Sequence, residues 1–159
     1  MISGAAPEFE LPSLHGARQS LRELVAGGPV LLAFFKVSCP TCQLTLPFLE
    51  RLHQGRAADA PRVVAISQDD AAATEKFNQR YGISLPVLLD PAGSSGGVRY
   101  PVSNAYRITN VPSLFLIERD GEISLSVTGF DRAEMEKLGV RFGVRLFTSA
   151  DRVPVFQPG

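Results

Sequence analysis

Residues 30–42, VLLAFFKVSCPTC, are the stretch of sequence that decides the fold. Their first part, Val30–Phe35, is a continuous apolar run, which is typical of a central strand covered on both faces. Apolar residues then recur at helical spacing over 44–52. The two cysteines between these segments, Cys39 and Cys42, therefore lie at a predicted junction between a strand and a helix.

Strand and helix signals alternate along the rest of the chain until a hairpin and a last helix close the pattern. Further strands are predicted at 63–66, 86–90, 114–117 and 123–127. Helices are predicted after Ser20, around Pro47 with a kink, from a cap at Asp69 or Asp70 as far as Gly82, at 104–107 and after Asp131. The early alternation implies parallel pairing, and the hairpin around Asp120-Gly121 adds antiparallel strands. We therefore predict an α/β fold with a mixed central sheet flanked by helices.

The composition fits one globular domain and excludes nucleic acid as a partner. The chain has 159 residues, of which 45% are hydrophobic and 20% charged, and its 16 basic and 16 acidic side chains balance. Such a balance offers no field that would attract nucleic acid or anionic lipid. We expect a single domain over 1–159, with a core of about 6–147 and an irregular tail at 148–159.

Targeting signals are lacking at the start of the sequence. No basic region followed by an apolar stretch is present there, and no apolar run approaches the length of a membrane span. We therefore expect no membrane span and a cytoplasmic protein as the sequence is written. A periplasmic or extracytoplasmic location is expected instead if a leader has been trimmed.

The two cysteines are the only ones in the chain, and they are three positions apart. Such a pair cannot staple distant segments, so its role is either redox chemistry or half of a metal site. The first position of the following helix offers unpaired N–H groups that stabilise a thiolate, which favours Cys39 as the nucleophile. Cys42, one turn further on, would resolve the mixed disulfide. Pro40 falls in the first turn, where its missing N–H costs nothing.

Other interpretations of these residues are weaker. Two buried structural cysteines are one alternative, but a C-x-x-C pair at such a junction favours redox chemistry. A metal site needs two more ligands, and only His15 and His53 are available as histidines, so no metal is expected. The glycine-rich residues 93–97 resemble a phosphate loop only superficially, since no Lys-Ser/Thr follows them, and we expect a turn there.

A family resemblance adds to this interpretation. Residues 34–42 followed by Pro47, together with VPSLFLI at 111–117 and Asp120-Gly121, resemble the thioredoxin superfamily, in particular its redoxin branch of TlpA-like and AhpC/TSA-type proteins. The likeness covers about 6–142. It implies a thioredoxin-like fold with an N-terminal extension and a redoxin-type insertion, much of which would lie within 86–107.

The resemblance also implies a substrate groove. From the residues alone, Pro112 would be an ordinary trans proline at the start of a strand. The family pattern implies instead a cis Val111–Pro112 bond beside the cysteines and a groove that pairs with the substrate backbone. Gly129, after the last strand, would line the same surface, and we place Pro40 and Thr41 on it as well.

The sequence departs from the family pattern next to the cysteines. Ser38 stands where the family usually has tryptophan, and Pro40 and Thr41 are in the reverse of the common order. Thr45 replaces a frequent glutamate, and Ala33 replaces the buried aspartate of thioredoxin. Both usual groups for proton transfer to Cys42 are therefore missing. We expect water, Thr45 or Lys36 to handle this proton.

The expected function is that of a thiol–disulfide oxidoreductase whose only redox group is the Cys39–Cys42 pair. It would reduce disulfides in proteins or small molecules and be reduced in turn by an upstream thiol. A thiol peroxidase of the AhpC/TSA type is the alternative, although the peroxidase arginine usually stands where this chain has Pro112. A copper chaperone on the same fold ranks third, because no histidine follows His53.

Overall fold

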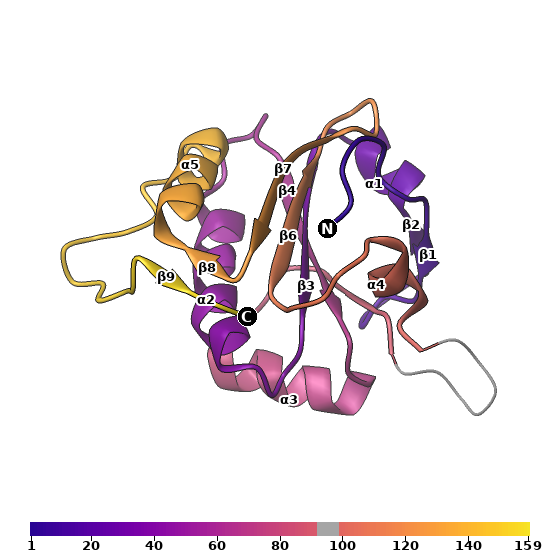
Figure 1. Cartoon of the computed structure of the whole chain (residues 1–159), viewed down its shortest axis with the longest axis horizontal. Helices are drawn as coiled ribbons and strands as arrows, with labels where there is room; N and C mark the ends of the chain where they lie inside the picture. Colours follow the sequence, from indigo (N-terminus) through magenta and orange to yellow (C-terminus); the bar gives the residue numbers. More distant parts are fainter. Residues whose placement is uncertain (92–98) are drawn as a thin grey trace.

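The central feature of the computed structural model, which describes residues 1–91 and 99–159, is a five-stranded mixed sheet with the order β5-β4-β3-β6-β7 (Figure 1). The strands are β3 Val30–Phe35, β4 Arg62–Ser67, β5 Val87–Leu89, β6 Ser113–Ile117 and β7 Ile123–Thr128. The β3–β4 and β4–β5 pairs are parallel, whereas β6 runs antiparallel to both β3 and β7. The predicted mixed sheet is thereby confirmed.

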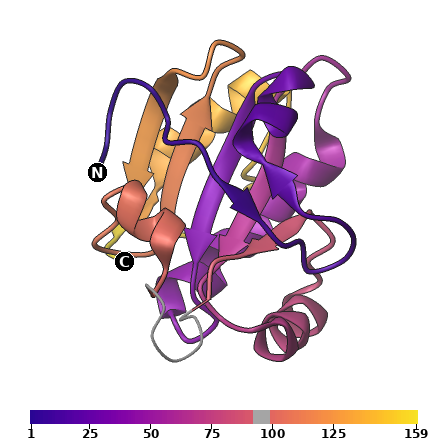
Figure 2. The same cartoon turned by 90° about the vertical axis from the view of Figure 1, so that its right-hand side faces the viewer.

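Helices cover both faces of the sheet, as predicted (Figure 2). One face carries α2 Pro40–Gly55, α3 Ala71–Tyr81 and α5 Arg132–Phe142, and the other carries α1 Leu21–Ala26, α4 Pro101–Ala105 and the hairpin of β1 Glu10–Leu11 with β2 Gln19–Ser20. Strand β3 contributes alternate side chains to the two layers, because successive residues of a strand point to opposite faces. All six of its residues are fully buried.

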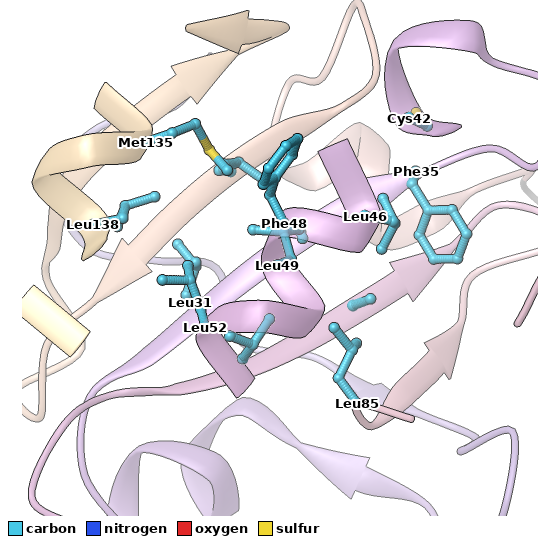
Figure 3. Close-up of a cluster of buried hydrophobic side chains, with 14 of the residues drawn as sticks. Leu31, Phe35, Cys42, Leu46, Phe48, Leu49, Leu52, Leu85, Met135 and Leu138 are labelled. Atoms are coloured by element: carbon cyan, nitrogen blue, oxygen red, sulfur yellow. The ribbon is translucent and has the colours of Figure 1, made fainter. Parts of the chain in front are cut away.

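The larger core cluster lies between the sheet and helix α2. Leu46, Leu49 and Leu52 of α2 are fully buried in it (Figure 3). Met135 and Leu138 of α5 belong to the same cluster. Helix α2 continues through Pro47, so the proline does not end it. The helix that carries the two cysteines is therefore held along its length by the core.

The helix ends agree with the capping signals in the sequence. Ser20 and Glu23 form the predicted capping box before α1. The Asp70 side chain accepts a hydrogen bond from the Ala73 N–H before α3, and Gly82 ends that helix in the left-handed conformation. These caps satisfy N–H groups that helix ends leave without a partner.

Two expectations about the end and the middle of the chain require correction. The tail predicted to be irregular contains a short strand, β9 Phe156–Gln157, which pairs antiparallel with β8 Phe130–Asp131. A strand of two residues is too short to produce a periodic pattern. The helical turn predicted at 104–107 begins earlier, at Pro101, because proline is well suited to the first helical position. The turn predicted at 93–97 lies outside the described residues.

Candidate active site

Cys39 lies at the start of helix α2, directly after the turn that follows β3. It is the N-cap residue, and its Sγ accepts a hydrogen bond from the Cys42 N–H at 3.2 Å. Pro40 follows at the first helical position, as predicted. The sulfur therefore lies where the free N–H groups of the helix point, and the side chain is partly exposed. The nucleophile expected from the sequence is reachable from solvent.

Cys42 lies one turn further on and faces the interior. Its side chain is fully buried in the core cluster that also contains Phe35 and Leu46 (Figure 3). Burial raises the pKa of the Cys42 thiol, and its hydrogen bond with the Cys39 side chain raises it further. A thiol stays neutral where a charged sulfur would be poorly solvated. The two cysteines are thus distinct, one at the surface and one beneath it.

The loop before β6 brings a third segment to the cysteines. The Val111–Pro112 peptide bond is cis, as the family resemblance implied. The Cys39 thiol donates to the Val111 carbonyl with an Sγ–O distance of 3.3 Å. The Gly129 N–H donates to the Pro112 carbonyl at 2.8 Å, so this glycine, with φ +76°, lies at the same edge. Residues predicted from three separate parts of the chain are therefore brought together.

The residues proposed to assist Cys42 are engaged elsewhere. The Thr45 hydroxyl is buried and donates to the Thr41 carbonyl, with an oxygen–oxygen distance of 2.7 Å. The Lys36 ammonium lies 5.6 Å from the centroid of the Tyr100 ring. Ser38 is exposed. Thr45 is therefore held by the helix backbone, and among the described residues no hydrogen bond joins its side chain to Cys42.

Asp69 was predicted only as one of two candidate helix caps, but Asp70 is the cap and Asp69 lies near the site. Its carboxylate accepts a hydrogen bond from the Val37 N–H at 2.9 Å, which holds the turn before Cys39. Asp69 follows β4, the parallel neighbour of β3. Because the carboxyl ends of neighbouring parallel strands meet at one edge of a sheet, this placement was a signal available in the sequence.

The C-terminal segment also reaches the site, which nothing in the sequence indicated. The Thr41 hydroxyl donates to the Pro158 carbonyl at 2.6 Å and accepts from the Gln157 side-chain amide at 2.8 Å. The Asn110 amide donates to the Gly159 carbonyl at 3.3 Å. The side chains and loops expected to contact substrate therefore contact the protein's own chain.

Possible metal ligands are scattered in the described part of the chain. Within 1–91 and 99–159, no three His, Cys, Asp or Glu side chains gather closely enough to hold an ion. In the same residues, no helix is long and apolar enough to cross a membrane.

Comparison with known proteins identifies the family. The model of the AhpC/TSA family matches residues 2–126. The chain belongs to the AhpC/TSA family. Among curated proteins, this AhpC/TSA chain is 27% identical over 129 residues to the thiol-disulfide oxidoreductase ResA of Geobacillus kaustophilus, covering 80% of the chain and 70% of that protein. ResA of Halalkalibacterium halodurans is 32% identical over 125 residues, covering 78% of this chain and 66% of the relative.

Solved structures agree with these relatives. A Chlorobium tepidum protein assigned as the thiol:disulfide interchange protein DsbE has a TM-score of 0.75 and 26% identity to this AhpC/TSA chain, covering 89% of it and 95% of the Chlorobium protein. StoA of Bacillus subtilis has a TM-score of 0.65 at 24% identity, covering 83% of the chain and 95% of StoA, and shows the shared fold. The thioredoxin-like fold predicted from the sequence is confirmed. The relatives and the adjacent cysteines also show the predicted class of activity, that of a thiol–disulfide oxidoreductase.

Proposed function

We propose that this oxidoreductase acts as a reductase, with Cys39 as the attacking thiol and Cys42 as the resolving thiol. The observation that carries the proposal is the placement of the two sulfurs. Cys39 is partly exposed at the helix N-terminus, where its sulfur accepts the Cys42 N–H, and Cys42 is buried behind it. A negative charge on the outer sulfur is stabilised by this N–H and by the helix dipole.

The reaction proceeds by two exchanges of sulfur–sulfur bonds. The Cys39 thiolate attacks a substrate disulfide, which forms a mixed disulfide and releases one substrate thiolate that takes up a proton. Cys42 then loses its proton and attacks the Cys39 sulfur, which releases the second substrate thiol and leaves a Cys39–Cys42 disulfide. Two electrons pass to the substrate. An upstream thiol reductant supplies two electrons and two protons to restore both thiols.

The surface around Cys39 supports binding of a polypeptide backbone. We assign this role to Pro40, Thr41, Val111, Pro112 and Gly129. The Val111 carbonyl accepts a hydrogen bond from the Cys39 thiol. The Thr41 hydroxyl lies on the same edge, where it donates to a backbone carbonyl and accepts from a side-chain amide of the C-terminal segment. Groups that hydrogen-bond an extended chain recognise it without regard to its side chains, which suits a reductase of varied disulfides.

Water is our candidate for the proton acceptor of Cys42. Burial raises the pKa of this thiol, so it must lose its proton when it attacks. Thr45 donates to a helix carbonyl, and the Lys36 ammonium lies over an aromatic ring. In the mixed disulfide, water that enters beside Cys42 would then accept its proton.

The decisive experiment uses the variants Cys39→Ser and Cys42→Ser with insulin as a protein disulfide and dithiothreitol as reductant. We expect the wild-type chain to speed insulin reduction and both variants to lose this activity. Cys42→Ser should in addition accumulate a mixed disulfide with insulin, whereas Cys39→Ser should accumulate none. Trapping through Cys42 instead of Cys39, or full activity in either variant, would overturn the assignment of roles.

Thiol peroxidase activity receives less support from this site. In the described part of the chain, the hydrogen-bond partners of the Cys39 sulfur are backbone groups of Cys42 and Val111 and the Cys42 side chain, and no arginine is among them. Pro112 occupies the position at which the peroxidase arginine is usual. Oxidation of the reduced protein by hydrogen peroxide at the rate of a free thiol would agree with this ranking, and oxidation faster by orders of magnitude would reverse it.

The direction of electron flow depends on the reduction potential of the pair. Equilibration against glutathione buffers measures this potential. A value near that of thioredoxin, about −270 mV, would support a cytosolic reductase. A value near that of the oxidant DsbA, about −120 mV, would contradict the reductase and favour an extracytoplasmic role.

A further inference from the structure

Residues 156–159 lie across the surface that we assign to substrate. Thr41 holds this segment through two hydrogen bonds, to the Pro158 carbonyl at 2.6 Å and from the Gln157 amide at 2.8 Å. The Asn110 amide adds a bond to the Gly159 carbonyl at 3.3 Å. These contacts are of the kind that an extended substrate would make, because most of them go to backbone groups.

Close packing of backbones shows how tightly the segment fits. A Cβ atom added at Gly159 would overlap the Val111 carbonyl oxygen, and one added at Gly129 would lie 2.6 Å from the Gln157 carbonyl oxygen. Neither position can accept a methyl group without movement. The Val111 carbonyl is also the group to which the Cys39 thiol donates, so Gly159 lies against the immediate neighbour of the reactive sulfur.

The segment is ordered by strand pairing but weakly buried. Strand β9 pairs with β8 over two residues, and the Arg132 N–H donates to the Val155 carbonyl at 3.0 Å. Phe156 is 54% exposed, and Val155 is 78% exposed. Few apolar contacts therefore oppose its release, and segments of this kind open at low free-energy cost.

We propose that residues 156–159 are an internal ligand of the substrate surface, which a protein substrate must displace before its disulfide reaches Cys39. This inference rests on the function proposed above. A polypeptide competes with the segment for Thr41 and Val111, so its apparent affinity is reduced by the fraction of molecules in which the segment is bound. A small disulfide needs only the partly exposed sulfur and escapes this competition.

The test compares the wild-type chain with the full-length double variant Gln157→Ala/Gly159→Ala. The first change removes the amide bond to Thr41, and the second places a methyl group against the Val111 carbonyl. Insulin serves as the protein disulfide and 5,5′-dithiobis(2-nitrobenzoate) as the small one. We expect the KM for insulin to fall by about two- to tenfold, the effect of one lost hydrogen bond on an equilibrium constant, with kcat unchanged. The rate with the small disulfide should stay the same.

The control variant is Val155→Ala, which changes an exposed side chain of the same segment and leaves the contacts with Thr41 and Val111 in place. It should behave as the wild type with both disulfides. An unchanged KM for insulin in the double variant would overturn the internal-ligand proposal while leaving the reductase intact. Absence of wild-type activity towards both disulfides would overturn the proposed function itself.

A second measurement does not depend on turnover. Hydrogen exchange at residues 155–159 is compared in two forms of Cys42→Ser, one carrying a cysteine-containing peptide on Cys39 and one carrying a single small thiol. We expect exchange to become faster with the peptide and to stay unchanged with the small thiol, relative to Cys42→Ser carrying no adduct. Equal protection in the two forms would show that the peptide binds elsewhere and would contradict the proposal.

Discussion

The guanidinium of Arg51 and the carboxylate of Asp151, 100 residues apart in sequence, are joined by two hydrogen bonds of 2.8 and 3.0 Å. Arg51 also donates to the Leu146 carbonyl at 3.2 Å. The pair fastens the segment that precedes β9 to helix α2, which begins directly after Cys39. Arg51 is therefore one link between the body of the domain and the segment that lies on the surface we propose for substrate.

The substitution Arg51→Met is expected to loosen this segment. Removal of a bidentate partner leaves Asp151 without its cation and Leu146 without its donor, so hydrogen exchange over 148–157 should speed up. The matched control is Arg141→Met, which breaks a similar bidentate pair with Glu118 away from the cysteines. Exchange over 148–157 that is equally fast in the two variants would contradict the anchoring role.

The same pair predicts a dependence of stability on pH. Its hydrogen bonds from Arg51, followed by those from Thr148, hold the pKa of Asp151 well below its usual range. A carboxyl whose pKa is lowered by folding stabilises the protein above the unfolded value of about 3.9 and loses this effect as the pH falls through the folded value. The variant Asp151→Asn should thus be less stable than the wild type at pH 7, and the gap should close in acid. Urea unfolding of the two proteins at several pH values measures the difference between their unfolding free energies. A difference that widens in acid would refute the assignment.

Alkylation is expected to separate the two cysteines. With iodoacetamide, the native reduced protein should take up one group, on Cys39, and a second only after denaturation, because Cys42 is fully buried and burial raises its pKa. Mass spectrometry of digests locates the groups. Alkylation of both thiols at equal rates in the native protein would refute the prediction.

The buried Cys42 thiol also predicts a dependence of stability on pH. A thiol whose pKa is raised by folding stabilises the reduced protein below the unfolded value of about 8.5 and loses this effect as the pH rises. The variant Cys42→Ser should therefore lack this loss of stability at alkaline pH.

Proton transfer from Cys42 is expected to survive the loss of either candidate side chain. A residue that carries out proton transfer contributes about 10²–10⁴-fold to a rate. We expect Thr45→Val and Lys36→Met to leave the resolution of a preformed mixed disulfide within about threefold of the wild type, far below that range. Stopped-flow kinetics measures this step. A loss of about a hundredfold in one variant would assign the proton to that residue.

Gly129→Ala is expected to release β9 while costing little more folding stability than the same substitution at Gly121. Gly129 has φ +76° and Gly121 has φ +85°, so an alanine at either position costs about 1–2 kcal/mol in backbone strain. Only at Gly129 does the added Cβ meet the chain, at the Gln157 carbonyl, whereas Gly121 faces open space. Denaturant unfolding should give similar losses for the two variants, and fast exchange at β9 should appear in Gly129→Ala alone. Slow exchange at β9 in that variant would show that the segment shifts to accommodate the methyl group and stays paired with β8.

Much of the fold could be predicted because its signals are local. The apolar run at 30–35, the caps at Ser20 and Asp70 and the turn at Asp120-Gly121 each depend on a few neighbouring residues, and the structure has the expected element at each. The cysteine pair was found for the same reason, since its chemistry follows from a strand that leads into a helix.

The features that could not be predicted depend on contacts between distant residues. Strand β9 exists because Gly129 lets the Gln157 backbone approach, and no periodic pattern marks such a strand. Asp69 reaches the site through the parallel pairing of β3 with β4. The alternation of strands and helices implied that pairing, but the sequence does not state which side chain at the shared edge would turn toward the cysteines.

The antiparallel pairing of β3 with β6 has a consequence for the order of events during synthesis. Phe34 pairs with Ser113, so the carbonyl beside Cys39 comes from a part of the chain that leaves the ribosome more than seventy residues later. A nascent chain that has reached Cys42 carries both thiols but lacks the Val111–Pro112 loop and Gly129, which lie beside them in the folded protein. We therefore expect the emerging thiols to have ordinary, unselective reactivity until β6 docks, so the specificity of this enzyme is acquired late and all at once.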